Sequence, residues 1–147
     1  MQISTAIKWG HRLLTVALLA AVILFCIVQY MTSGPYHDRL YSQKSLTENI
    51  WLYVTKYQDA GATDSDIYRY YLYHRIDGDP MEVLGDSTPF MTADRGDASV
   101  SGVGSRITVR LTGKIYSFSN SAFFYDGKTA VMPTIDLDAR GVNAWRE

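Results

Sequence analysis

The sequence contains little that could crosslink the chain or carry out catalysis. Its single cysteine, Cys26, lies inside an apolar run, so no intramolecular disulfide can form and the fold must depend on its apolar core. No nucleophile-elbow pattern is present, and Gly102–Ser105 precedes a predicted strand instead of the helix that a phosphate loop requires. We therefore predict no catalytic residues and expect that the protein is not an enzyme.

Clusters of basic residues are also absent. All 15 acidic residues follow the apolar run, together with 12 of the 14 basic ones, which leaves that part of the chain with a formal charge of about −3. A phosphate backbone is bound by a concentrated basic face. We therefore expect no nucleic-acid partner.

Metal ligands are sparse. His11, His37 and His74 are the only histidines, and none has a cysteine or a second histidine at ligand spacing, so no zinc site is predicted. An acidic series lacks the spacing and the terminal glutamate of a calcium loop. Turn-forming roles are the preferred interpretation, with calcium left open, for Asp77, Asp79, Asp86, Asp94 and Asp97. No cofactor and no small-molecule substrate is indicated.

The sequence does contain one uncharged apolar run, residues 13–30. As a helix, this run spans about 27 Å, close to the roughly 30 Å core of a bilayer. It is too long for a cleaved signal peptide, Phe25 before Cys26 does not suit a lipoprotein, and a core helix would show a polar stripe. We predict a transmembrane helix over residues 13–33, preceded by a short N-terminus of residues 1–12.

The charges that flank this run predict its orientation. Lys8 and Arg12 precede it without any acidic residue, whereas charges of both signs follow it. Basic flanks favour the cytoplasmic side, so the N-terminus is expected in the cytoplasm. Residues 36–147 then form one extracytoplasmic domain behind a single-pass anchor in the cell membrane.

Spacing and turn residues predict the elements of this domain. Gly34–Pro35 is expected to kink the chain, and an alternating four-three spacing predicts a helix from Tyr36 to Tyr57, ended by Gly61. Thr63 is expected to cap a shorter helix that carries Ile67–Leu72. A short strand is predicted over Met81–Leu84, followed by a loop over residues 85–105.

The last third of the chain predicts strands. In Arg106–Phe118, the apolar residues Ile107, Val109, Leu111 and Ile115 alternate with polar ones. Asp126–Gly127 predicts a hairpin turn, and Thr129–Ala139 a further strand, placed at an edge by Pro133. The predicted fold class is α+β, with two helices packed on a small antiparallel sheet of three to four strands.

Two sets of residues are candidates for protein contacts. Small residues on the anchor would let a neighbouring helix approach closely, the alternative being that they face lipid. This membrane-packing set is Ala17, Ala20 and Ala21. In a helix, Tyr70 and Tyr73 would be exposed beside Arg69, a composition typical of interfaces, although they could equally cover the edge of a small core. The interface set is Tyr68, Arg69, Tyr70 and Tyr73.

The order of these parts resembles the TadE-like pseudopilins and their relatives in conjugative elements. Gly104–Leu111 looks like the start of a strand in that group, and residues 135–147 look like its terminal strand and polar-aromatic tail. The cleavage pattern of the group is not matched, since His11 and Arg12 follow Gly10. The resemblance implies a pilin-like, membrane-anchored structural subunit that assists the assembly of a pilus or of a conjugation or secretion apparatus.

Two further functions are kept as alternatives. The first is a scaffold of a conjugative secretion channel resembling the VirB8 group, which also places helices before a curved antiparallel sheet behind one anchor. The second is a membrane-tethered ligand-binding domain. The expected partners are membrane lipid and other membrane subunits or further copies of this chain.

Overall fold

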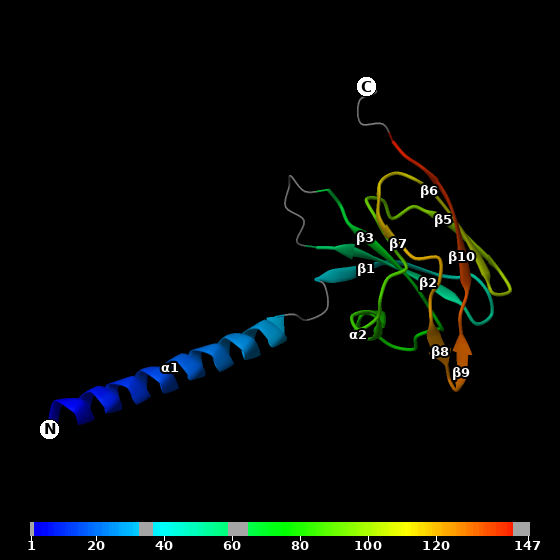
Figure 1. Cartoon of the computed structure of the whole chain (residues 1–147). Helices are drawn as coiled ribbons and strands as arrows, with labels where there is room; N and C mark the ends of the chain where they lie inside the picture. Colours follow the sequence, from blue (N-terminus) through cyan, green and yellow to red (C-terminus); the bar gives the residue numbers. More distant parts are fainter. Residues whose placement is uncertain (1, 33–36, 59–64, 143–147) are drawn as a thin grey trace. The chain divides into compact units, whose positions relative to one another are not determined.

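The computed structural model describes residues 2–32, 37–58 and 65–142. It divides into two units, Met1–Gly34 and Pro35–Glu147. Figure 1 shows that the first contains one long helix and that the second is built mainly of strands. The predicted kink at Gly34–Pro35, the helix end at Gly61 and the helix start at Thr63 lie outside the described residues.

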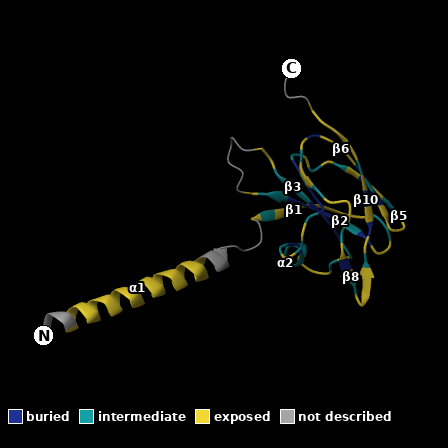
Figure 2. Ribbon diagram, viewed as in Figure 1, coloured by how far each residue is buried: buried dark blue, intermediate teal, exposed yellow. Residues whose placement is uncertain are grey.

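The first unit is the helix α1, Gln2–Thr32. Its segment Thr5–Val28, of 24 residues, is long and apolar enough to cross a membrane. The side chains of this segment are exposed (Figure 2). The sequence prediction of one apolar N-terminal helix is confirmed, but the helix begins well before residue 13 and includes the N-terminal segment that we expected to precede it.

The helix predicted over residues 36–57 is wrong. The chain instead forms β1, Asp38–Ser45, and β2, Trp51–Tyr57, which pair as an antiparallel hairpin. β2 carries apolar side chains on both faces, because Leu52 and Val54 lie in one core cluster and Tyr53 in another. Burial on both faces removes the polar alternation that identifies a strand, and the remaining apolar positions mimic a helical stripe.

The same explanation applies to the second predicted helix, which is the strand β3, Tyr68–Tyr73. Tyr70 and Leu72 face the first cluster, while Tyr71 faces the second. The predicted strand Met81–Leu84 is instead the helix α2, Pro80–Leu84. Asp79 caps it by accepting a hydrogen bond from the backbone nitrogen of Met81 at 3.0 Å, and a proline at the first helical position is favourable.

The predicted loop over residues 85–105 contains two strands, β4, Met91–Ala93, and β5, Ser99–Val103. The predicted long strand divides at Gly113 into β6, Arg106–Thr112, and β7, Ile115–Phe118, which belong to different sheets. The alternation of Ile107, Val109 and Leu111 is confirmed, since all three are buried. The predicted hairpin turn is also confirmed: β8, Phe124–Asp126, and β9, Thr129–Val131, flank Gly127, whose φ is +61°.

Three sheets result among the described residues. The first has the order β1-β2-β3-β4-β7 and is antiparallel; the second has the order β10-β6-β5, where β10 spans Thr134–Arg140 and runs parallel to β6; the third is the β8–β9 hairpin. The single strand predicted over Thr129–Ala139 is wrong, because the chain forms two strands there, β9 and β10, in different sheets, with Pro133 between them; β10 does lie at a sheet edge. The chain combines helix and strand as predicted, but the prediction of two helices packed on a sheet of three to four strands is wrong: among the described residues, the domain has one short helix, α2, and ten strands, five of them in one sheet.

The main core lies between the two larger sheets, and Figure 2 shows its buried segments. Its members from the first sheet include Leu52, Val54, Tyr70 and Leu72, and those from the second include Val100, Ile107, Val109 and Ile135. A smaller cluster of Tyr53, Tyr71 and Leu84 forms where α2 packs. Close packing between sheets, and not helix packing on one sheet, therefore holds the domain together.

A buried ion pair fastens the first residue of β1 to the sheet. The Asp38 carboxylate, whose side chain is 2% exposed, accepts hydrogen bonds from Arg69 Nη1 and, at 2.6 Å, from Thr55 Oγ1. The Arg69 guanidinium also lies 5.7 Å from the centre of the Tyr57 ring. Both charged groups are removed from water, so removing either residue would leave the other as a buried charge without a partner.

We predict that Asp38→Asn or Arg69→Met lowers the free energy of unfolding by about 3–5 kcal/mol, the cost of removing one member of a buried pair. The double variant should lose less stability than the two single losses added together, because it leaves no buried charge without its partner. Denaturant unfolding of the full chain in detergent, followed by near-ultraviolet circular dichroism, measures both. The exposed pair Arg75–Asp77 supplies the control, since Asp77→Ala should change stability by less than about 1 kcal/mol. Additive losses at Asp38 and Arg69 would contradict the coupling.

Candidate docking surface

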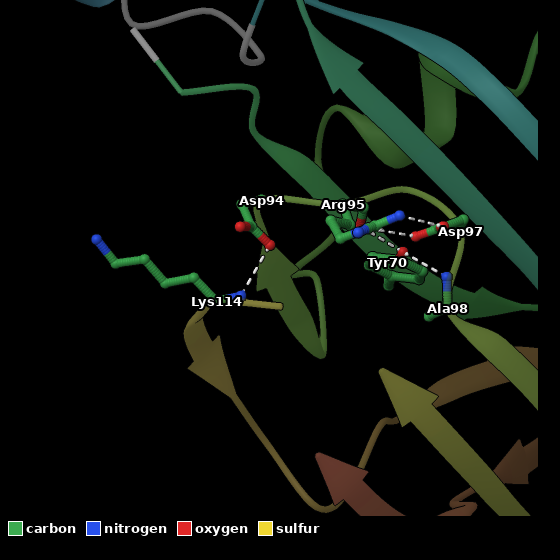
Figure 3. Close-up of polar contacts among 6 residues, drawn as sticks. All are labelled: Tyr70, Asp94, Arg95, Asp97, Ala98 and Lys114. Carbon is green, nitrogen blue, oxygen red and sulfur yellow. Dashed lines mark hydrogen bonds and ion pairs between the residues drawn. The ribbon is translucent and has the colours of Figure 1, made fainter. Parts of the chain in front are cut away.

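The predicted interface set does not form one surface. Tyr70 is fully buried, so the expectation that it is exposed is wrong. Its hydroxyl donates a hydrogen bond to the Arg95 carbonyl at 2.6 Å and accepts one from the Ala98 backbone nitrogen at 3.3 Å (Figure 3). A strand projects successive side chains to opposite faces, which is why the helical assignment misplaced this residue.

Tyr70 holds the segment that connects the two larger sheets. Residues 94–98 lead from β4 to β5, and the Tyr70 hydroxyl bonds both Arg95 and Ala98 within them. The Arg95 guanidinium donates two hydrogen bonds to the Asp97 carboxylate, at 3.0 and 2.8 Å. These bonds lower the pKa of Asp97 and raise that of Arg95. Asp94 accepts a hydrogen bond from the Lys114 backbone nitrogen at 2.8 Å (Figure 3).

The other members of the set are held within the domain. Tyr68 is 8% exposed, and its ring packs edge-on against Tyr41 with 5.0 Å between centroids. Arg69 is paired with Asp38. Tyr73 is half-buried, and its ring lies 5.4 Å from that of Phe124. The core-edge interpretation therefore describes Tyr68, whereas Tyr70 lies inside the core, and a contact role stays a prediction only for Tyr73.

Two exposed aromatic rings lie in contact at the β8–β9 hairpin. Phe124 faces the core and pairs with Val131 across the hairpin, so the flanking residues face outward. Phe123 and Tyr125 are 55% and 56% exposed, and their rings contact edge to face at 5.0 Å. Met132 is 67% exposed. We call this surface the hairpin patch, and its residues are Phe123, Tyr125, Ala130 and Met132.

Sequence reasoning missed the hairpin patch, although a signal was present. In the run Phe123-Phe124-Tyr125, a strand that is covered on one face only buries either the central ring or the two outer ones. Beside the patch lies a hollow of about 470 Å³, whose walls include Tyr73, Pro89, Phe90, Phe123 and Tyr125. The patch and the hollow together offer apolar and aromatic surface, which suits the side chains of a protein partner.

A second hollow, of about 610 Å³, has charged walls. Arg95, Arg110 and Arg140 line it together with Asp97 and Asp138. Asp97 is paired with Arg95, and Asp138 lies 3.6 Å from Arg110. A surface of both signs favours a polar or zwitterionic group over a simple anion.

Four of the five acidic residues considered for calcium have local partners, and the fifth, Asp86, lies in the wall of the hollow beside the hairpin patch. Asp79 caps α2, Asp94 bonds the Lys114 backbone, and Asp77 and Asp97 pair with neighbouring arginines. Within the part of the chain that the structure describes, no three histidine, cysteine or acidic side chains are grouped to hold a metal. Ala17, Ala20 and Ala21 lie on α1 with exposed side chains, and their role in membrane packing stays a prediction.

Burial raises the pKa of Tyr70 from 10.0 to about 12, and burial also raises that of Tyr53. The unfolded chain therefore releases these protons at a lower pH than the folded chain does. We predict that stability is unaffected by Tyr70 below pH 10 and falls by about 2–3 kcal/mol as the pH rises to about 12. Denaturant unfolding of the full chain at several alkaline pH values measures this, and Tyr70→Phe should show a smaller loss. An equal loss in the variant would contradict the assignment.

Comparison of this sequence and structure with protein-family models, with curated proteins and with solved structures gives no match. No relative therefore supplies a function or a set of site residues. What the protein does has to be argued from its own surfaces, because a fold alone does not specify a function.

Proposed function

We propose that this protein is a non-enzymatic, membrane-anchored assembly subunit that docks other proteins through the hairpin patch. The observation that carries the proposal is the exposure of Phe123, Tyr125 and Met132 together on one hairpin face. Exposed aromatic and methionine side chains in one place are enriched at protein interfaces and costly to leave in water. At this hairpin, the buried Phe124 ring packs in the core and stabilises the domain. The exposed rings of Phe123 and Tyr125 are left for contact with another protein.

The helix α1 supports the anchoring half of the proposal. Thr5–Val28 has the length and composition for one crossing, and its exposed apolar surface would be satisfied by lipid. Lys8 and Arg12 lie in the first half of this segment, before the uncharged run of residues 13–30, and basic residues at that end favour an N-terminus in the cytoplasm and an extracytoplasmic domain. Within the bilayer, the small face of Ala17, Ala20 and Ala21 would allow a second helix to pack closely.

The specific form that we propose is a pilin-like subunit of a pilus or of a conjugation or secretion apparatus. Its support is the resemblance of Gly104–Leu111, which covers the turn before β6 and all of β6 except its last residue, and of the terminal strand, which is β10. The amphipathic helix that the resemblance placed after the anchor is a pair of strands. A channel scaffold remains the second form, and its support is an antiparallel sheet in the domain that follows α1 in the sequence, although this sheet has five strands and the helices expected before it are the strands β1, β2 and β3.

A ligand-binding domain is the remaining alternative, and the charged hollow favours it. Three arginines and two aspartates converge there on about 610 Å³. This alternative would make the charged residues, and not the aromatic ones, the functional set. Suppose that Arg140→Ala abolishes the protein's activity in the cell while Phe123→Ser leaves that activity normal. This result would support the ligand-binding role over the assembly role.

We predict that Phe123→Ser and Tyr125→Ser reduce crosslinking of this chain to its partner proteins in native membranes by about tenfold or more, as expected for aromatic hot spots. Quantitative mass spectrometry of the crosslinked chains measures this change. Tyr116→Ser is the matched control, because Tyr116 is 42% exposed but lies on β7, outside the patch. All variants should give the circular dichroism spectrum of the folded domain. Unchanged crosslinking in both patch variants would contradict the proposed docking role.

We also predict that the intact chain stays in the membrane fraction after alkaline carbonate washing, because an apolar helix of 24 residues is retained by the bilayer core. In a Cys26→Ser background, Ser101→Cys on exposed β5 should react with a membrane-impermeant maleimide added to intact spheroplasts. Recovery of the chain in the wash would contradict anchoring. Labelling only after lysis would contradict the extracytoplasmic placement.

A further inference from the structure

β10 is an edge strand with a regular ladder. It pairs in parallel with β6 from Thr134–Arg106 to Arg140–Thr112 without a bulge. Among the described strands, none lies beyond it in the order β10-β6-β5. The edge strand β1 differs, because a register shift between Leu40 and Ser42 interrupts its pairing with β2. Bulges disfavour further pairing, so the straight edge of β10 is the better template for another strand.

The hydrogen bonds of β10 show which backbone groups face outward. The Thr134 nitrogen bonds the Ser105 carbonyl, and the Arg140 carbonyl accepts from the Gly113 nitrogen, so even-numbered residues face β6. The Ile135 nitrogen instead bonds the Asn120 carbonyl on the opposite side. Backbone direction alternates along a strand, so Leu137 and Ala139 also direct their N–H and C=O groups outward.

Only the first part of this edge is covered within the described residues. Asn120 bonds Ile135, and Ser121 forms an isolated bridge with Thr134. The following stretch, Leu137–Gly141, has no such partner among the described strands. We call this stretch the open edge. An open edge of this length can accept one further strand.

We propose that the open edge pairs antiparallel with the same stretch of a second copy of this chain. Charge complementarity favours this occupant. When Ala139 lies opposite Ala139 of the second copy, Asp138 lies opposite Arg140, and the two-fold axis repeats that pair. Both residues project from the exposed face of the strand, where Asp138 already lies 3.6 Å from Arg110.

The neighbouring registers are unfavourable. Centring the pair on Leu137 places Asp136 opposite Asp138, and centring it on Asp138 places that carboxylate opposite its own copy. Centring it on Arg140 brings two guanidinium groups together. The register centred on Ala139 avoids all these like-charge pairs, and it places Leu137 opposite Gly141, which leaves room for the larger side chain. The charges therefore select one register and oppose indiscriminate strand stacking.

Anchoring would strengthen such a short contact. Two copies held in one bilayer meet at a much higher effective concentration than two copies free in solution. A pairing of a few residues can then be populated although it buries little surface. This step depends on the proposed anchoring, whereas the choice of register does not.

Cysteine crosslinking tests the contact directly in native membranes. The probe is Ala139→Cys in a full-length Cys26→Ser background, because directly opposed hydrogen-bonded residues lie about 5.5 Å apart between Cα atoms, within disulfide reach. We expect mild oxidation to give a disulfide-linked dimer at a yield about tenfold above that of Ser101→Cys, which lies on the other edge strand of the same sheet. Equal yields, or linkage mainly to a different protein, would overturn the proposal.

Charge exchange tests the register. In the Ala139→Cys background, Asp138→Arg or Arg140→Asp should lower the dimer yield about tenfold, because each creates two like-charge pairs. The combination Asp138→Arg with Arg140→Asp should restore it. Asp136→Arg is the matched control, since it breaks the exposed pair with Arg106 without changing the facing charges. Failure of the double exchange to restore the dimer in a folded chain would overturn the register.

Self-pairing through the open edge and docking through the hairpin patch can be tested independently. Loss of the β10 contact is measured as dimer yield from Ala139→Cys, and loss of docking is measured as crosslinking to other chains in Phe123→Ser. The open edge and the hairpin patch lie on different strands and in different sheets. A dimer that persists in Phe123→Ser would support self-pairing independently of the docking role.

Discussion

Burial of β2 and β3 on both of their faces is the constraint on which the domain depends. One face of these strands packs into the core between the two larger sheets, and the other contacts the cluster that includes Leu84 of α2. A domain of this size without a disulfide has to bury a large share of its apolar surface to be stable. Two-sided burial of the tyrosine-rich strands provides this, and it explains why so many aromatic rings are needed here.

Polar contacts fix the position of two segments at the border of the apolar core, the start of β1 and the connection between β4 and β5. Asp38 and Arg69 fasten the start of β1 across the sheet, and the Tyr70 hydroxyl fastens the segment between β4 and β5. Each contact joins residues that are far apart in sequence, so each forms only when the sheets are assembled. Buried polar groups of this kind specify one arrangement of strands and penalise others, because an unsatisfied partner is costly.

The surfaces left over have different chemical character. The hairpin patch is aromatic and apolar, the charged hollow carries both signs, and the open edge of β10 presents backbone groups between alternating charges. The proposed anchor would bring copies together in one bilayer and so make weak contacts at such surfaces effective. The proposed assembly role would use these surfaces for contacts with further copies of the chain and with other proteins.

By itself, the sequence determined the features that depend on neighbouring residues. The length of the apolar run predicted the N-terminal helix, the alternation of Ile107, Val109 and Leu111 predicted β6, and Asp126–Gly127 predicted the hairpin turn. Tertiary structure alone decided that residues 38–45, 51–57 and 68–73 are strands, that Tyr70 is buried, and that Phe123 and Tyr125 face outward. A strand covered on both faces has no polar alternation, so its identity comes from partners distant in the sequence.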